Sequence, residues 1–348
     1  MALPSERLEH SLIDYPKVEL HRHLEGSLRM STVLEIARGE GLFPHWEADQ
    51  VAAAVRVNGH EPHNWSNFLA KFDTLRVLYS SPEVIERITQ EAIEDAALDG
   101  VRHLELRFTP ATLARQRAFP IDQVFSWVVT AAEKASEAHA LSVRLIASIN
   151  RHEPVEEAEL VAASACEWVG RGVVGLDLAG NEVEFPAEPF RSIFAEARKA
   201  GLGLTVHAGE WTGAQSVEHA MLAMQADRIA HGVRILEDPR LVAMAVERRT
   251  CFEVCLTSNV LSGVVGRLED HPLPRMIEAG LRVTLGTDDP AVCGVRLSDE
   301  YARAMKHLGL STVSLAGLVL TAAQASFLPD REKMRLELAL RPELLAVA

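Results

Sequence analysis

Eight short β-rich runs alternate with longer helical patterns along the chain, and this alternation restricts the fold more than any other feature. The runs lie at Lys17–Leu24, Val101–Phe108, Leu141–Ile149, Val173–Leu178, Gly203–His207, Arg228–His231, Cys251–Leu256 and Leu281–Leu285. Apolar residues recur at helical spacing between them, as in Pro154–Gly170 and Pro189–Ala200. Strand–helix alternation is typical of parallel βαβ units, and eight units favour a closed barrel over an open sheet. We therefore predict an α/β protein with a (β/α)8 TIM-type barrel.

The connection between the first two runs is much longer than the others. It covers about residues 28–100 and contains helical patterns at Trp65–Leu78 and Pro82–Asp99. A structureless loop of this length is uncommon in a compact domain, so we predict a helical insertion after the first strand. Residues from about Leu297 onward predict extra C-terminal helices, ending in LALRPELLAVA with a frayed end. We expect a single domain over residues 1–348.

Composition excludes several classes of protein. Hydrophobic residues make up 48% and charged residues 24%, which argues against a disordered or fibrous chain. The net charge of −14 disfavours nucleic acid and anionic membranes as partners, but it is compatible with a small neutral substrate. The N-terminus has no apolar signal region, and no apolar stretch is long enough to span a membrane. The four cysteines are scattered without a C-x-x-C pair, which indicates reduced thiols, so we expect a cytoplasmic protein.

Titratable side chains stand where four of the predicted strands end. The first strand ends with His21 and His23, which point to the same face because they are two residues apart. The others end at His207 with Glu210, at His231, and at Asp288 with Asp289. In a barrel of this type the C-terminal strand ends meet at one face, where the chemistry occurs. We therefore expect these side chains to converge.

Each of these residues has a simpler interpretation when taken alone. A single histidine at a strand end is more often structural, and adjacent aspartates are often a turn or a helix cap. The joint pattern favours a metal site. Imidazole and carboxylate ligands without thiolates suit zinc, with iron, cobalt or nickel as substitutes. A two-metal hydrolase would usually need a lysine after the fourth strand, where Asp177–Gly180 has none. We therefore expect one Zn²⁺ per chain.

Zinc with one open position brings the pKa of a coordinated water from about 9 down to about 7. The resulting hydroxide is a nucleophile at neutral pH, and the reaction also needs a base and an acid. Glu210 and His231 are the available pair beside the predicted metal.

The order of the motifs resembles the adenosine deaminase family, a branch of the amidohydrolase barrels. The motifs are PKVELHRHLEGSLR, FLAKFD, GLDLAGNE, HAGE, RIAHGV, CLTSNV and TDDP, and the resemblance extends from about Pro16 to the neighbourhood of Pro329. The H-x-E and P-C-x-x-C pattern of cytidine-type zinc deaminases is missing.

This resemblance implies a role for each matching residue. The zinc ligands would be His21, His23, His207 and Asp288. Glu210 would protonate ring N1 as hydroxide adds to C6 of adenine, and His231 would orient the hydroxide and act as its base. Asp289 would hydrogen-bond the ring at N7, and the backbone N–H of Gly180 would meet N3.

Two further segments gain an interpretation from the resemblance. Trp65, Phe68, Leu69 and Phe72 have helical spacing, which more often marks a core, but the family uses this segment as an apolar lid over the ligand. Glu25 stands where many members have Asp, a residue that holds a ribose hydroxyl. Glutamate there also occurs in relatives that act on adenine or on modified nucleosides.

A few other positions are expected to support the site. Ser258 and Asn259 could steady Asp288 or the neighbouring loops, and Arg151-His152 reads as a supporting pair. Gly286 stands where the family more usually has Asn, which would alter the packing below the site.

The sequence thus predicts zinc-dependent hydrolytic deamination of adenosine and 2′-deoxyadenosine to inosine and ammonia, with a purine nucleoside as the small-molecule partner and the oligomeric state left open. Alternative substrates are adenine and a 5′-modified adenosine such as aminodeoxyfutalosine. An amide or ester hydrolase on the same barrel is disfavoured by the missing lysine and by the TDDP pair. A catalytically inactive purine-binding relative would lack a ligand, Glu210 or His231, and the chain has them all.

Overall fold

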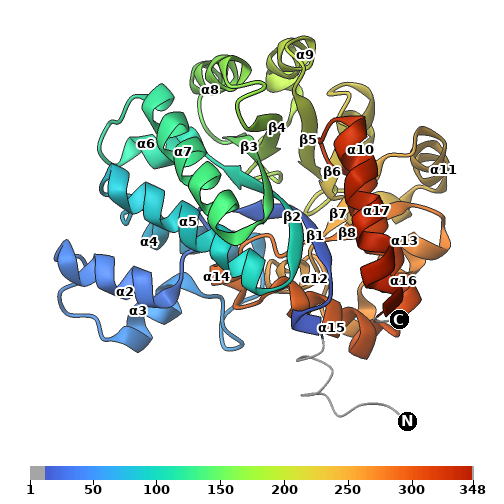
Figure 1. Cartoon of the computed structure of the whole chain (residues 1–348), viewed down its shortest axis with the longest axis horizontal. Coiled ribbons are helices and arrows are strands. Elements are labelled where there is room, and N and C mark those ends of the chain that lie inside the picture. The colour runs from blue at the N-terminus through green and yellow to red at the C-terminus, as the bar shows by residue number, and fades with distance from the viewer. Residues whose placement is uncertain (1–11, 347–348) are drawn as a thin grey trace.

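The computed structural model describes residues 12–346, and they fold around eight parallel strands in the order β1 to β8 (Figure 1). The strands are β1 (Lys17–His23), β2 (Val101–Phe108), β3 (Ser142–Asn150), β4 (Val173–Ala179), β5 (Gly203–Ala208), β6 (Arg228–His231), β7 (Cys251–Val254) and β8 (Arg282–Leu285). Each strand pairs in parallel with the next one in the chain. The predicted eight-stranded barrel is confirmed, with small shifts at the strand ends.

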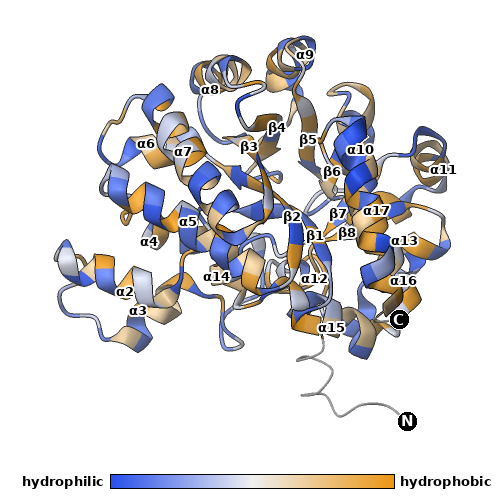
Figure 2. Cartoon of the chain, in the orientation of Figure 1, coloured by the Kyte–Doolittle hydropathy of each residue, from blue (hydrophilic) through white to orange (hydrophobic). Residues whose placement is uncertain are grey.

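Amphipathic helices cover the outside of the barrel, with hydrophilic and hydrophobic residues on the same ribbon (Figure 2). The α-helices between strands are α6 (Pro110–Arg115), α7 (Ile121–His139), α8 (Val155–Glu167), α9 (Arg191–Lys199), α10 (Ala214–Leu222), α11 (Pro239–Arg248), α12 (Leu256–Leu261) and α13 (Leu273–Glu278). Short 3₁₀ turns lie at η1 (Glu188–Phe190), η2 (Val233–Glu237) and η3 (Leu268–Asp270). In the described part of the chain, no helix is long and apolar enough to cross a membrane.

The long first connection holds four helices, α2 (Met30–Gly39), α3 (Ala48–Val55), α4 (Trp65–Arg76) and α5 (Pro82–Leu98). The Asn64 side chain accepts from the N–H of Asn67 and so caps α4, and Ser81 caps α5 in the same way. Helix α5 packs on α7 and β2 as an ordinary outer helix of the barrel, whereas α4 contributes residues to the pocket at the strand ends.

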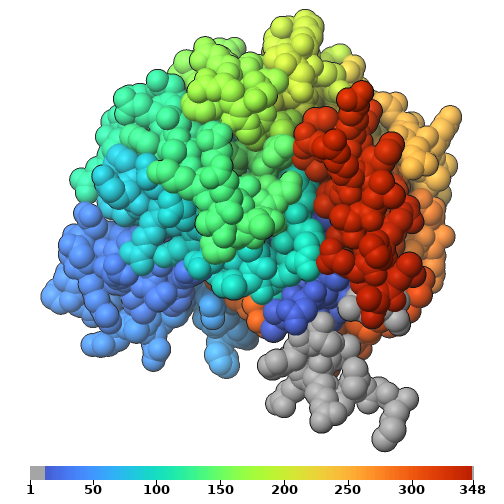
Figure 3. All heavy atoms as spheres, viewed as in Figure 1, coloured from blue at the N-terminus to red at the C-terminus, as the bar shows by residue number. Residues whose placement is uncertain are grey.

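The C-terminal helices are α14 (Pro290–Cys293), α15 (Leu297–Leu308), α16 (Thr312–Ala325) and α17 (Asp330–Ala346). In Figure 3, α16 and α17 lie at the opposite side of the molecule from α2 and α3. The segment between α16 and α17 lies against the N-terminal ends of the strands. There the Phe327 ring packs 3.6 Å from the Arg228 guanidinium and close to Gly203, which has no side chain to obstruct it.

The seam between the first and last strands closes at the predicted metal ligands. The N–H of His23 donates to the carbonyl of Asp288 at 2.8 Å, and the N–H of Asp288 donates to the carbonyl of His21 at 3.0 Å. Gly286 permits this approach, because a Cβ there would lie 2.7 Å from the His21 carbonyl oxygen and 2.8 Å from its Cβ. The seam therefore fixes the backbones of β1 and β8 at the site.

Replacing Gly286 by alanine should destabilise the protein, because the new methyl group overlaps β1. Overpacking of this kind costs about 1–3 kcal/mol of unfolding free energy. Urea unfolding followed by circular dichroism measures the change. The matched control is Gly317→Ala inside α16, where a Cβ would meet nothing within 4 Å. That change should raise stability by up to about 1 kcal/mol. Equal unfolding midpoints for Gly286→Ala and the wild type would contradict the steric argument.

Candidate active site

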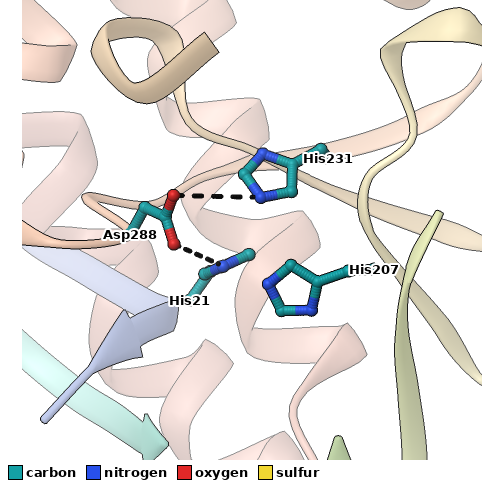
Figure 4. Close-up of side chains that lie close together, drawn as sticks. All are labelled: His21, His207, His231 and Asp288. Carbon is teal, nitrogen blue, oxygen red and sulfur yellow. Dashed lines mark hydrogen bonds and ion pairs between the residues drawn. The ribbon is translucent and has the colours of Figure 1, made fainter. Parts of the chain in front are cut away.

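Four buried imidazoles gather at the C-terminal strand ends. His21 and His23 come from β1, His207 from β5 and His231 from β6. The ring centroids of His21 lie 5.3 Å from His23, 5.0 Å from His207 and 4.9 Å from His231. The structure therefore brings together the histidines that the sequence placed at separate strand ends, three of them visible in Figure 4.

Asp288 lies beside these rings, directly after β8. Its Oδ1 lies 3.1 Å from Nε2 of His21 and 3.4 Å from Nε2 of His23. Its Oδ2 lies 3.9 Å from Nε2 of His231 and accepts a 2.6 Å hydrogen bond from the Ser258 hydroxyl. The prediction that Ser258 steadies Asp288 is confirmed.

Two of the histidines are backed by buried carboxylates. His207 Nδ1 lies 3.1 Å from Oδ1 of Asp177, and His21 Nδ1 lies 3.4 Å from Oε2 of Glu253. A carboxylate behind an imidazole keeps the proton on that nitrogen and leaves a lone pair on the other one. The Nε2 atoms of His21 and His207 are therefore suited to bind a metal. Sequence reasoning missed the roles of Asp177 and Glu253, although both lie on strands that end at the site.

The arrangement fits a divalent cation. The ligand atoms of His21, His207, His231 and Asp288 lie within 4.8 Å of one another, and those of His23, Asp177 and His207 form a second such group. Neutral imidazole nitrogens and a carboxylate oxygen, with no thiolate, are a donor set that suits zinc. By distance alone, His231 is as well placed to bind the ion as the predicted ligands His21, His207 and Asp288. His23 belongs to the second group.

Two residues of the cluster have a strained backbone. His231 has φ 59° and Asp288 has φ 61°, in the left-handed region that non-glycine residues rarely adopt. Such a conformation costs of order 1–3 kcal/mol and persists only where surrounding contacts enforce it. At these strand ends the strained backbone turns both side chains toward the same point.

One buried carboxylate shapes the loop that follows β5. Glu182 accepts backbone hydrogen bonds from residues 209 to 212, at 2.7 Å from Gly209 and 2.8 Å from Trp211, and it also accepts one from the Ser216 hydroxyl. These bonds wrap the loop around Glu182 and hold Glu210 beside the histidines. The GLDLAGNE motif ends in Glu182, but nothing in the sequence shows that its partners lie one strand further on.

The predicted catalytic residues Glu210, His231 and Asp289 line one pocket together with His23 and His207. Glu210 is buried, and its Oε1 lies 3.6 Å from Nε2 of His231. Burial raises the pKa of Glu210 well above its ordinary value, and the charges of Asp288 and Glu182 raise it further. Burial also lowers the pKa of His231 well below its ordinary value. Burial thus favours the protonated carboxyl of Glu210 and the neutral ring of His231.

Asp289 lines the same pocket as a second buried carboxyl group. Its Oδ1 has no hydrogen-bond partner. Burial and the neighbouring charge of Asp288 raise its pKa well above the ordinary value. A protonated carboxyl in this position can donate a hydrogen bond to a ligand.

The predicted lid residues line the pocket with one exception. Phe68, Leu69 and Phe72 of α4 form part of the wall. Trp65 does not line the pocket, and its ring centroid lies 6.4 Å from that of Trp211. Gly180 lies on the wall with φ 89°, and a Cβ there would lie 2.7 Å from Nδ1 of His152. A side chain at this position would therefore collide with His152.

Glu25 and Arg76 are the charged residues on the α4 side of the pocket. Oε1 of Glu25 accepts a 2.6 Å hydrogen bond from the N–H of Thr109, and its Oε2 has no partner. Burial raises the pKa of Glu25 to about 7, and the charge of Arg76 opposes this rise. Arg76 is the only lysine or arginine among the pocket-lining residues of the described chain, and its Nε is also unpartnered. Sequence reasoning did not single out Arg76.

Comparison with known proteins gives consistent matches over nearly the whole chain. The family model for adenosine deaminase matches residues 16–341. The chain is 37% identical over 324 residues to an adenosine deaminase of Klebsiella pneumoniae, and this alignment covers 92% of the chain and 96% of the relative.

Solved structures match as well. An amidohydrolase from Burkholderia ambifaria with bound Zn has a TM-score of 0.90 at 28% identity, covering 100% of this chain and 94% of the other. An adenine deaminase from Arthrobacter aurescens has a TM-score of 0.86 at 28% identity, covering 95% and 98%. Arabidopsis ADAL complexed with IMP has a TM-score of 0.86 at 30% identity, covering 99% and 100%.

His21→Ala should lower the metal content of the protein, because it removes a ring that contacts Asp288 and three other histidines. Elemental analysis of purified, zinc-dialysed protein measures the stoichiometry, and circular dichroism checks that the variant is folded. His307→Ala is the control, because this partly exposed histidine on α15 pairs only with Glu269. If His21→Ala retained one zinc per chain, His21 would not be a ligand.

Proposed function

The chain belongs to the adenosine deaminase family, and from this membership we propose that it hydrolyses adenosine and 2′-deoxyadenosine to inosine and ammonia. The observation that carries the proposal is the shared pocket of a histidine–aspartate cluster and two buried carboxyl groups, Glu210 and Asp289. A metal-binding group, a proton donor and a second hydrogen-bond donor are the components that addition of water to a purine ring requires.

We assign one zinc ion to the site, held by His21, His23, His207 and Asp288. The donor chemistry of these residues and the zinc bound in the Burkholderia relative support this choice. Zinc supplies Lewis acidity, which brings the pKa of a coordinated water from about 9 to about 7.

The chain's own residues supply the proton and the orientation of the ring. Glu210, protonated because it is buried among negative charges, gives its proton to N1, and C6 becomes the electron-poor atom that water attacks. Asp289 donates to N7, and the backbone of Gly180 meets N3. Three contacts in the plane of the ring fix C6 over the histidine cluster, and such positioning supplies a large part of the rate.

The apolar side chains of α4 exclude water from the reaction. Phe68, Leu69 and Phe72 form an apolar part of the pocket wall. Removing water strengthens the polar contacts inside the pocket and protects the proton on Glu210 from exchange during the reaction.

Adenosine fits the unpartnered atoms of the pocket better than adenine does. Oε2 of Glu25 is buried without a partner, and a ribose hydroxyl would satisfy it. Free adenine would leave this oxygen unsatisfied, which costs about 1–3 kcal/mol when the site is closed. Because an adenine deaminase from Arthrobacter has a similar structure, adenine is the first alternative substrate.

A nucleoside with an anionic group at the sugar is the second candidate substrate, and Arg76 is the observation that favours it. Arg76 is partly exposed, and its one ion pair is a 3.4 Å contact with Asp73, whose side chain is 76% exposed. Because Nε of Arg76 is unpartnered and its contact with Asp73 is long and exposed, this guanidinium can bind a phosphate or a carboxylate. The Arabidopsis relative complexed with IMP is a case of a 5′-phosphate bound in this fold.

Ammonia release by the zinc-loaded protein, with adenosine, adenine and AMP at equal concentration, decides between these substrates. We expect turnover of adenosine to exceed that of adenine by about 5- to 150-fold, since one unsatisfied buried group is worth about 1–3 kcal/mol. Faster turnover of adenine would assign the chain to the adenine deaminases. AMP turnover that exceeds that of adenosine and is lost in Arg76→Gln would establish the nucleotide instead.

Glu210→Gln should nearly abolish turnover and leave zinc content unchanged. The amide still donates a hydrogen bond but cannot transfer a proton, and general acid catalysis is worth about 10² to 10⁴ in rate. Steady-state kinetics with adenosine and elemental analysis measure the two quantities. Glu184→Gln is the matched control, because this exposed carboxylate in the preceding loop lies outside the pocket. A Glu210→Gln enzyme with near-wild-type kcat would exclude Glu210 as the acid.

A further inference from the structure

A buried chain of hydrogen bonds runs from a backbone amide to the histidine beside Glu210. The N–H of Leu273 lies 3.1 Å from Nδ1 of His271, and Nε2 of His271 lies 3.2 Å from Oδ1 of Asn259. Nδ2 of Asn259 then lies 3.0 Å from Nδ1 of His231. The three side chains are all buried, so bulk water does not compete for these bonds.

The backbone amide fixes the direction of every bond in this chain. A backbone N–H can only donate, so Nδ1 of His271 accepts and carries no proton. Burial lowers the pKa of His271 to about 3, so the ring is neutral and its single proton is on Nε2. That N–H donates to the Asn259 side chain, which must present its oxygen to His271 and its NH₂ to His231.

The same logic fixes the tautomer of His231. Its Nδ1 accepts from the Asn259 NH₂, so the proton of the ring is on Nε2. The reversed orientation of Asn259 would place its NH₂ against the N–H of His271, with two donors facing each other. Nε2 of His231 lies 3.6 Å from Glu210 and 3.9 Å from Asp288, longer than a direct hydrogen bond. The N–H thus has space for a ligand atom between these two carboxyl groups.

His21 and His207 differ from His231 in the group that lies next to Nδ1 of the ring. His21 and His207 have carboxylates, Glu253 and Asp177, near Nδ1, so their Nε2 atoms present lone pairs. His231 has an amide NH₂ there, so its Nε2 presents a proton. A protonated ring nitrogen cannot bind a metal, even though distance alone groups His231 with the ligands.

We propose that Asn259 and His271 are positioning residues that hold His231 as an Nε2–H donor. His231 then orients the attacking water and does not bind the metal. The proton that the water loses passes to the carboxylate of Asp288, which lies 3.9 Å from Nε2 of His231, and from there to the amino group, which leaves as ammonia. This rests on the proposed function for the identity of the reaction, but the tautomer rests on the hydrogen bonds alone. It replaces the role of base that the sequence resemblance implied for His231.

Nitrogen-15 NMR of the full-length, zinc-loaded protein with labelled histidine tests the tautomer without any assay. The two ring nitrogens of a neutral histidine differ strongly in chemical shift, and spectra of His231→Gln and His271→Gln assign the signals. We expect the proton on Nε2 in both rings. A proton on Nδ1 of His231 would overturn the proposal, whatever substrate the protein acts on.

Asn259→Asp tests the consequence for catalysis. The carboxylate is nearly isosteric with the amide but only accepts, so it draws the His231 proton to Nδ1 and exposes a lone pair at Nε2. We expect kcat for adenosine to fall at least about tenfold with little change in KM, because the contact acts in the transition state. An equal or higher kcat would identify His231 as a base and overturn the proposal.

His271 offers a rescue test that a merely structural role would not pass. Gln can donate its NH₂ to Asn259 and accept from Leu273, so His271→Gln keeps the direction of the chain, whereas His271→Leu removes it. We expect His271→Gln to retain most of kcat and His271→Leu to lose about as much as Asn259→Asp. The control, His307→Leu, should match the wild type. Equal losses in His271→Gln and His271→Leu would exclude the relay. A wild type inactive on every purine would refute the proposed function, while the NMR result would still decide the tautomer.

Discussion

Two buried arginines inside the barrel hold the carboxylates on which the site depends. Arg107 of β2 contacts Glu253 and lies 3.6 Å from Asp177, and Arg228 of β6 pairs with Glu253 and, at 2.6 Å, with Glu105. Buried carboxylates are costly unless they are paired, and removing one partner of such a pair costs about 3–5 kcal/mol. The arginines therefore allow Glu253 and Asp177 to remain ionised behind the rings of His21 and His207, next to their Nδ1 atoms.

The site is consequently built as a series of contacts. The guanidinium groups contact buried carboxylates, two of these carboxylates lie behind imidazoles, and His207 lines the pocket with Glu210 and Asp289. His231 differs from His21 and His207, because the amide of Asn259 takes the place of the carboxylate found behind those two rings.

Much of this arrangement could be predicted from the sequence. Period-two spacing gave His21 and His23 a common face, and the barrel rule brought together strand ends far apart in the chain. The supporting contacts could not be predicted, because they join distant positions without a local pattern. Arg107 and Glu253 are 146 residues apart, and Glu182 finds its partners only after the loop beyond β5 folds around it. The predicted seventh strand extends beyond the observed one, because Leu256 begins the short helix α12. Ser258 and Asn259 on this helix contact Asp288 and His231.

The seam of the barrel has a consequence for how the protein is made. His21 and Asp288 lie 267 residues apart, on either side of the junction between the first and last strands. While the chain is still growing on the ribosome, the histidines of β1, β5 and β6 are made before Asp288. A metal ion held by His21 and Asp288, as proposed, would join the first strand to the last one, so its binding would stabilise the closed barrel.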